Sequence, residues 1–140
     1  MTGAGAARAT LVAAIVANGL GWVLPAFSDE RGWAAFFFAL SPLWDYRSFQ
    51  SEPFPLLAFI VSSALTNVLF VALAVALALG KTRLAKPVLW AAAAATLLNL
   101  YWPILLEADR ARLETGFFIW VSSFALLALS AFLTLRSAPR

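Results

Sequence analysis

Four long stretches without a charged residue limit what this chain can fold into. They cover residues 9–28, 53–80, 87–106 and 115–135. A helix rises about 1.5 Å per residue, so about 20 residues cross a hydrocarbon core of about 30 Å. The stretches are continuously apolar and do not alternate, which excludes membrane-spanning strands. We therefore expect an all-α integral membrane protein, whose four transmembrane helices form an up-down-up-down bundle.

The composition agrees with lipid as the main solvent of the chain. The 140 residues are 63% hydrophobic and 12% charged, and the mean hydropathy is +0.87. Soluble domains are nearer half apolar and a quarter charged, and a small domain leaves much of its area exposed to water. We expect one four-helix domain over residues 1–140. Its transmembrane helices should lie near 8–27, 56–80, 87–106 and 116–135.

A cleaved signal peptide is the alternative for the first of these helices. Cleavage requires small residues at the site, and Leu24-Pro25-Ala26 offers a poor one. We therefore expect the first helix to be retained.

The charged residues between the apolar stretches fall into two unequal groups. The first group contains no acid and consists of Arg8, Lys81, Arg83, Lys86, Arg136 and Arg140. The second group occupies the 28–54 and 107–115 segments and contains four arginines and all seven acids. The positive-inside rule assigns the first group to the cytoplasm. We expect the N- and C-termini in the cytoplasm of a bacterium, with the chain in its inner membrane.

The first outer loop, residues 28–54, contains a further apolar segment. Ser28 is a favourable N-cap residue, and acids at positions 29 and 30 suit the first turn of a helix. Pro42 ends the pattern. The sequence predicts a short helix near 29–40, which is too short to span and should lie at the membrane interface.

Aromatic residues concentrate in the outer half of the predicted bundle. We identify a candidate lipid or partner surface made of Trp33, Phe37, Trp44, Trp102 and Trp120. A thick aromatic belt at the interface is one interpretation. A surface or cleft for a lipid tail, a quinone-like molecule or a partner helix is the other.

Polar side chains inside the predicted spans are not ionisable, apart from the phenol of Tyr101 near the outer end. A proton-coupled transporter generally needs an acid or a histidine at membrane depth, so that class fits poorly. The candidate polar cluster consists of Asn18, Ser63, Asn67, Asn99 and Ser122. These side chains could join the helices by hydrogen bonds, or they could form a binding spot or a narrow path for small solutes.

Small residues recur every four positions and predict helix-packing seams. Ala13, Ala17 and Gly21 form one such stripe, and Ala72, Ala76 and Gly80 form another. The resemblance of "FIVSSAL" at 59–65 to "FIWVSSFAL" at 118–126 leaves an internal duplication open.

The chain has no cysteine and no histidine. This excludes disulfides, thiolate metal sites and nucleophiles paired with histidine. The basic residues are not gathered on one soluble face, so we expect no nucleic-acid partner. We predict no catalytic residue, no metal and no cofactor other than a bound lipid or quinone.

These features lead to three hypotheses for function. The first is a non-enzymatic tetraspan subunit or accessory scaffold of a larger membrane complex, with other membrane subunits or further copies of itself as partners. The second is an oligomeric pore or carrier for small solutes. The third is a protein that binds a lipid or a quinone in the outer leaflet.

Overall fold

The computed structural model describes residues 3–105 and 112–137. Most of this chain is helical, and four helices are long and apolar enough to cross a membrane. In chain order the elements are α1 (Gly3–Val23), β1 (Pro25–Phe27), β2 (Glu30–Arg31), α2 (Gly32–Leu40), η1 (Ser41–Leu43), η2 (Tyr46–Phe49), α3 (Phe54–Ala78), η3 (Thr82–Leu84), α4 (Ala85–Leu100), α5 (Trp102–Leu105) and α6 (Thr115–Ser137).

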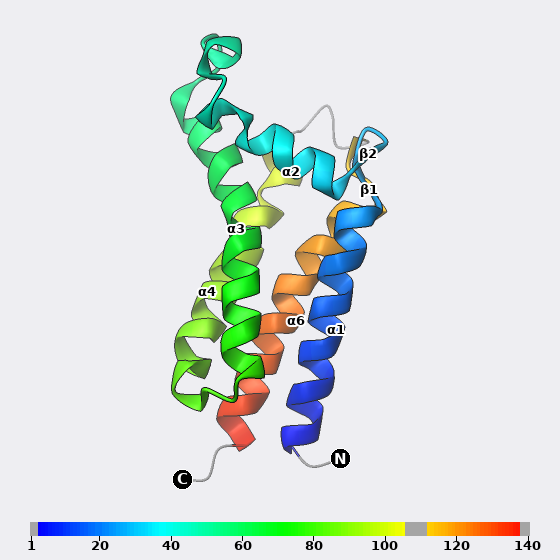
Figure 1. Cartoon of the computed structure of the whole chain (residues 1–140), viewed down its shortest axis with the longest axis vertical. Coiled ribbons are helices and arrows are strands. Elements are labelled where there is room, and N and C mark those ends of the chain that lie inside the picture. The colour runs from blue at the N-terminus through cyan, green and yellow to red at the C-terminus, as the bar shows by residue number, and fades with distance from the viewer. Residues whose placement is uncertain (1–2, 106–111, 138–140) are drawn as a thin grey trace.

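The four long helices α1, α3, α4 and α6 run alternately up and down (Figure 1). The start of α1 and the end of α6 lie at the same end of the bundle, together with the turn between α3 and α4. The β-hairpin and α2 lie at the opposite end, where α2 runs across the long helices from the α1 side to the α3 side. The prediction of a bundle of four apolar helices is confirmed.

Prolines set several helix ends. α1 ends at Val23, two residues before Pro25, because the residue before a proline disfavours helical geometry. α3 begins directly after Pro53 and has Pro55 in its first turn, where no amide donor is needed. The third predicted span is interrupted at Tyr101 and resumes as α5, which contains Pro103.

The turn at the far end of α3 depends on a left-handed glycine. Gly80 has φ +67° and donates its amide to the carbonyl of Leu77, while the Lys81 amide reaches the carbonyl of Ala76. This pair of bonds is a Schellman motif, which ends a helix at a glycine. Gly80 therefore ends α3 and does not extend a packing stripe.

The expected N-cap at Ser28 is not observed. Ser28 and Asp29 both have positive φ, 48° and 67°, and they connect β1 to β2, with Phe27 opposite Glu30. Two left-handed central residues are characteristic of the tight hairpin turn of type I′, which Asn and Asp tolerate better than most residues. α2 therefore begins at Gly32 instead of position 29, and the hairpin takes the residues before it.

α6 is the central helix, because it packs along both α1 and α4. The residues of α1 that are buried in this seam are spaced alternately four and three apart, as in helix pairs that form a left-handed supercoil. These residues are Ala7, Leu11, Ala14, Asn18 and Gly21. The expected stripe of Ala13 and Ala17 is displaced by one position, since Ala13 is exposed and Ala14 is fully buried.

The outward faces of the long helices are apolar. On α1 the exposed side chains include Val12, Val16 and Leu20, and on α3 they include Val68 and Val71. Contact of such apolar faces with lipid hydrocarbon is favourable, whereas their contact with water costs free energy.

Among the described residues, the carboxylates are confined to one end of the bundle. The end that contains the start of α1 and the end of α6 has only bases among its described charged residues, which are Arg8, Lys81, Arg83, Lys86 and Arg136. The described carboxylates belong to the opposite end, and they are Asp29, Glu30, Asp45, Glu52 and Glu114. Part of the charged turn between the third and fourth spans lies outside the described residues.

Candidate functional site

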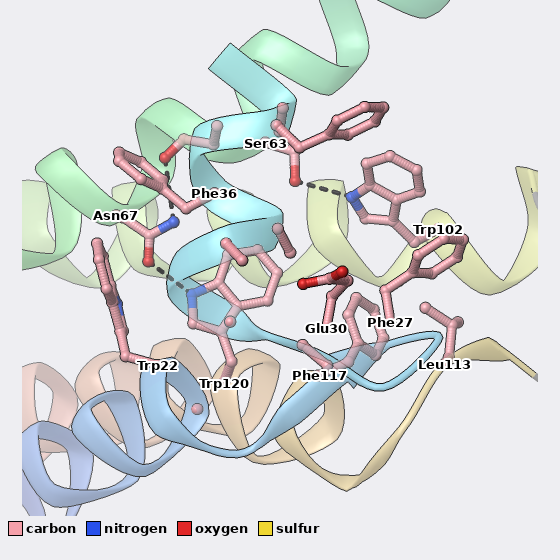
Figure 2. Close-up of a pocket in the computed structure, with 18 of the residues that line it drawn as sticks. Trp22, Phe27, Glu30, Phe36, Ser63, Asn67, Trp102, Leu113, Phe117 and Trp120 are labelled. Atoms are coloured by element: carbon pink, nitrogen blue, oxygen red, sulfur yellow. Dashed lines mark hydrogen bonds between the residues drawn. The ribbon is translucent and has the colours of Figure 1, made fainter. Parts of the chain in front are cut away.

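A cavity of about 740 Å³ lies at the end of the bundle that contains the hairpin and α2. Its lining comes from α1, the hairpin, α2, α3, α5, α6 and the two residues Arg112 and Leu113. Figure 2 shows aromatic side chains from several of these elements around the space. The cavity is therefore a product of the tertiary fold and belongs to no single helix.

Small residues on α2 leave room for the cavity. α2 contributes Ala34, Ala35 and Ala39 to the lining, together with two phenylalanines. One of these, Phe36, contacts Trp22 of α1, with ring centroids 5.1 Å apart. The aromatic contact holds α2 against α1 while the alanines leave the space open.

Two glycines permit close packing around the last turn of α1, one against α2 and the other against α6. A Cβ on Gly32 would collide with the carbonyl oxygen of Gly21. A Cβ on Gly21 would lie 2.6 Å from the Cβ of Trp120, much closer than atoms pack in protein interiors. The first turn of α2 therefore lies directly over the last turn of α1, and that turn of α1 packs closely against α6.

Two tryptophans join the walls of the cavity to α3. The indole nitrogen of Trp102 donates to the hydroxyl of Ser63 at 2.8 Å, and that of Trp120 donates to the amide oxygen of Asn67 at 2.8 Å. Figure 2 shows both bonds as dashed lines, from Trp102 to Ser63 and from Trp120 to Asn67. Since both indole donors are satisfied, the rings present apolar faces to the cavity.

The predicted polar cluster is divided among separate helix contacts. Asn18 of α1 donates to the hydroxyl of Ser123 at 3.1 Å, at the α1–α6 seam. Ser123 is fully buried, whereas Ser122 is exposed on the outer surface of α6. The sequence predicts Ser122 in the candidate polar cluster, whereas the structure buries its neighbour Ser123 against Asn18. Only the rotation of α6 about its axis distinguishes the two serines.

Asn99 is the centre of the contact between α3 and α4. Its amide oxygen accepts a hydrogen bond from Ser63 at 2.7 Å, and its amide nitrogen donates to Thr66 at 3.1 Å and to the carbonyl of Ala95 at 2.9 Å. Asn99 is fully buried. The structure thus brings Asn99 together with Ser63, which also accepts from Trp102, and places Asn67 one turn further along α3.

The candidate aromatic surface is also divided. Trp33 and Phe37 on α2 and Trp44 after η1 are 48%, 54% and 64% exposed and face outward. Trp102 and Trp120 instead line the cavity. The two groups are therefore different sites, one of them an outer surface and the other an interior wall.

Sequence reasoning missed several residues of the cavity. They are the aromatic residues Trp22, Phe27, Phe36 and Phe117 and the charged residues Glu30 and Arg112. One sequence pattern could have indicated the helix crossing beside the cavity. It is the dipeptide "GW", which occurs at 21–22 and at 32–33, since a glycine permits the close approach of another helix. The spacing of these motifs does not reveal which side chains face one another.

Comparison of this chain with protein-family models, curated proteins and solved structures gives no match. The class of protein is therefore defined by its own fold and site. It is a bundle with four helices long and apolar enough to cross a membrane, with an aromatic cavity at one end.

Proposed function

We propose that this protein binds the apolar part of an amphiphilic molecule in the cavity beneath α2. The observation that carries the proposal is the volume of about 740 Å³ bounded mainly by aromatic and alanine side chains. Small-molecule sites in proteins have volumes of about 300–1,000 Å³ and mostly apolar walls with a few polar groups. A water molecule takes about 30 Å³ and needs polar partners, so water alone would fill such walls poorly.

We further propose the orientation of the chain in the membrane. The end with only described bases would face the cytoplasm of a bacterium, and the hairpin end would face outward. The chain would then lie in the inner membrane with both termini inside. α2 would lie at the outer interface, where its exposed Trp33 and Phe37 suit the headgroup boundary. The ligand would enter from the outer leaflet.

The solute-pore hypothesis receives less support from the same geometry. The amides of Asn18, Asn67 and Asn99 are all engaged in hydrogen bonds between or within helices. Deeper in the bundle, Phe124 and Leu127 are fully buried and fill the interior. These contacts favour binding over conduction by a single bundle.

The subunit hypothesis stays a prediction and is compatible with ligand binding. The exposed apolar faces suit lipid and protein partners equally. Under either hypothesis we propose a binding role without catalysis.

Native mass spectrometry of the purified protein tests the proposed function. The wild type should retain one lipid or added dodecyl amphiphile per bundle. Ala35→Phe and Ala39→Phe place a ring inside the cavity and should reduce retention severalfold.

Ala58→Phe is the matched control, because Ala58 is exposed on α3 and does not line the cavity. It should retain the ligand like the wild type. Absence of any retained amphiphile on the wild type, or equal loss in all three variants, would contradict the proposal.

A further inference from the structure

Glu30 is the one acidic side chain among the described residues that line the cavity. Figure 2 shows its carboxylate directed toward the space between the labelled rings, in the same region as Trp120, Phe117 and Trp102. Glu30 is an exposed residue, so its carboxylate lines the open side of the cavity and is accessible to a ligand. A carboxylate beside aromatic rings attracts a ligand that brings a positive charge.

The hairpin determines the position of this carboxylate. The left-handed turn at Ser28 and Asp29 reverses the chain, so that Glu30 pairs with Phe27 across the hairpin and both residues line the cavity. Asp29 is not part of the lining, and its amide donates to the carboxylate of Glu114 at 2.5 Å. The adjacent acids thus differ in environment, and only Glu30 faces the site.

The rings around Glu30 have the chemistry that stabilises organic cations. The negative face of an aromatic ring attracts an ammonium group within about 6 Å, most strongly for Trp. Phe117 and Trp120 lie with ring centroids 6.0 Å apart and planes at 53°, so the two faces are not stacked on each other. Their indole and phenyl faces, with those of Trp102 and Phe27, bound the same cavity.

We propose that the cavity selects an alkylammonium group carried on an apolar chain, with Glu30 as its counter-ion and the rings of Phe27, Phe117 and Trp120 as its neighbours. This inference rests on the proposed function and names the chemical class of the ligand. A neutral quinone would use neither the carboxylate nor the quadrupoles of the rings. An anionic headgroup without an ammonium group would be repelled by the carboxylate of Glu30.

Arg112 also lines the cavity, and its carbonyl accepts the amide of Ser28 at 2.9 Å. A ligand with a phosphate next to its ammonium group would place the phosphate near this guanidinium. The ammonium could therefore belong to a zwitterionic lipid headgroup or to a free amphiphilic amine. Both kinds of ligand would place their ammonium group at Glu30, but only the affinity of the zwitterionic lipid would depend on Arg112.

Binding measured by tryptophan fluorescence in nonionic micelles tests the inference. The probes are dodecyltrimethylammonium, dodecylphosphocholine and 1-dodecanol, which share a chain and differ in the headgroup. Glu30→Gln keeps the shape of the side chain and removes its charge. It should weaken the binding of dodecyltrimethylammonium at least about tenfold and leave 1-dodecanol unchanged.

Two further variants make the test specific. Glu52→Gln removes an exposed carboxylate at the same end of the bundle that does not line the cavity, and it should bind all three probes like the wild type. Phe27→Leu keeps an apolar side chain without the ring quadrupole and should weaken only the two ammonium probes.

The outcomes separate the inference from the proposed function. Binding of all probes with equal affinity, unaffected by Glu30→Gln, would overturn the ammonium inference and leave a general apolar site. Absence of binding even for 1-dodecanol would overturn the proposed function itself. If dodecylphosphocholine binds more tightly and Arg112→Gln weakens only this probe, the ligand is a zwitterionic headgroup. Tighter binding of dodecyltrimethylammonium indicates a free amine.

Discussion

The indole nitrogen of Trp120 on α6 donates a hydrogen bond of 2.8 Å to the side-chain amide oxygen of Asn67 on α3. α3 and α6 also meet where the rings of Phe70 and Phe124 pack edge to face, with centroids 5.4 Å apart, so this bond adds a polar connection to an aromatic one. The same amide donates to the carbonyl of Ala64 within its own helix, which fixes its rotamer. The indole is thereby held in place as a wall of the cavity.

Trp120→Phe should destabilise the bundle through loss of this bond while an aromatic ring remains. Hydrogen bonds between membrane helices contribute about 0.6 kcal/mol on average and up to about 1.7 kcal/mol. A double-mutant cycle with Asn67→Leu, measured as free energy of unfolding in mixed micelles, should give a coupling energy in this range. A coupling near zero would show that the two side chains act independently.

Asn99→Ala should be more harmful than the loss of a single bond. Asn99 serves Ser63 and Thr66 at once, so its removal leaves buried partners unsatisfied, at about 1–3 kcal/mol for such a group. Thr96→Ala is the matched control on α4, because the Thr96 hydroxyl bonds only within its helix, to the carbonyl of Ala92. Equal losses of unfolding free energy for the two variants would contradict a central role of Asn99.

Gly32→Ala should lower the midpoint of thermal unfolding, because the new methyl group would collide with the carbonyl oxygen of Gly21. Overpacking of this kind costs about 1–3 kcal/mol. Gly19→Ala adds the same methyl group to α1 where nothing lies within 4 Å, and it should be neutral or slightly stabilising because alanine favours a helix. Differential scanning fluorimetry in detergent compares the two variants directly.

Single cysteines introduced into this cysteine-free chain test the proposed orientation. Glu52→Cys, between η2 and α3, should react with a membrane-impermeant maleimide on intact cells. Arg83→Cys, in η3, should react only after the membrane is opened. Labelling of both positions from the same side would refute a four-span topology, and the reverse pattern would invert the orientation.

The division of the candidate sites shows where sequence reasoning reaches its limit. Asn99 was identifiable because an amide within an apolar span must find a partner, and it is fully buried at a helix contact. Ser122 and Ser123 are adjacent and chemically identical, so the choice between them depends on how α6 is rotated about its axis. The hairpin was missed because a left-handed turn at Ser28 and Asp29 competes with helix capping by the same residues.

By itself the sequence determined the number of long apolar helices, their approximate ends and the confinement of all acids to two loop segments. These features depend on local composition and on the length of a helix. Only the tertiary structure decided which faces meet, since rotation about each helix axis depends on contacts between distant residues. Two features depend on such contacts. One is the crossing of α2 over α1 at Gly32 and Gly21, and the other is the placement of Glu30 among aromatic rings from other elements. The cavity exists because those distant contacts hold helices apart where small side chains leave space.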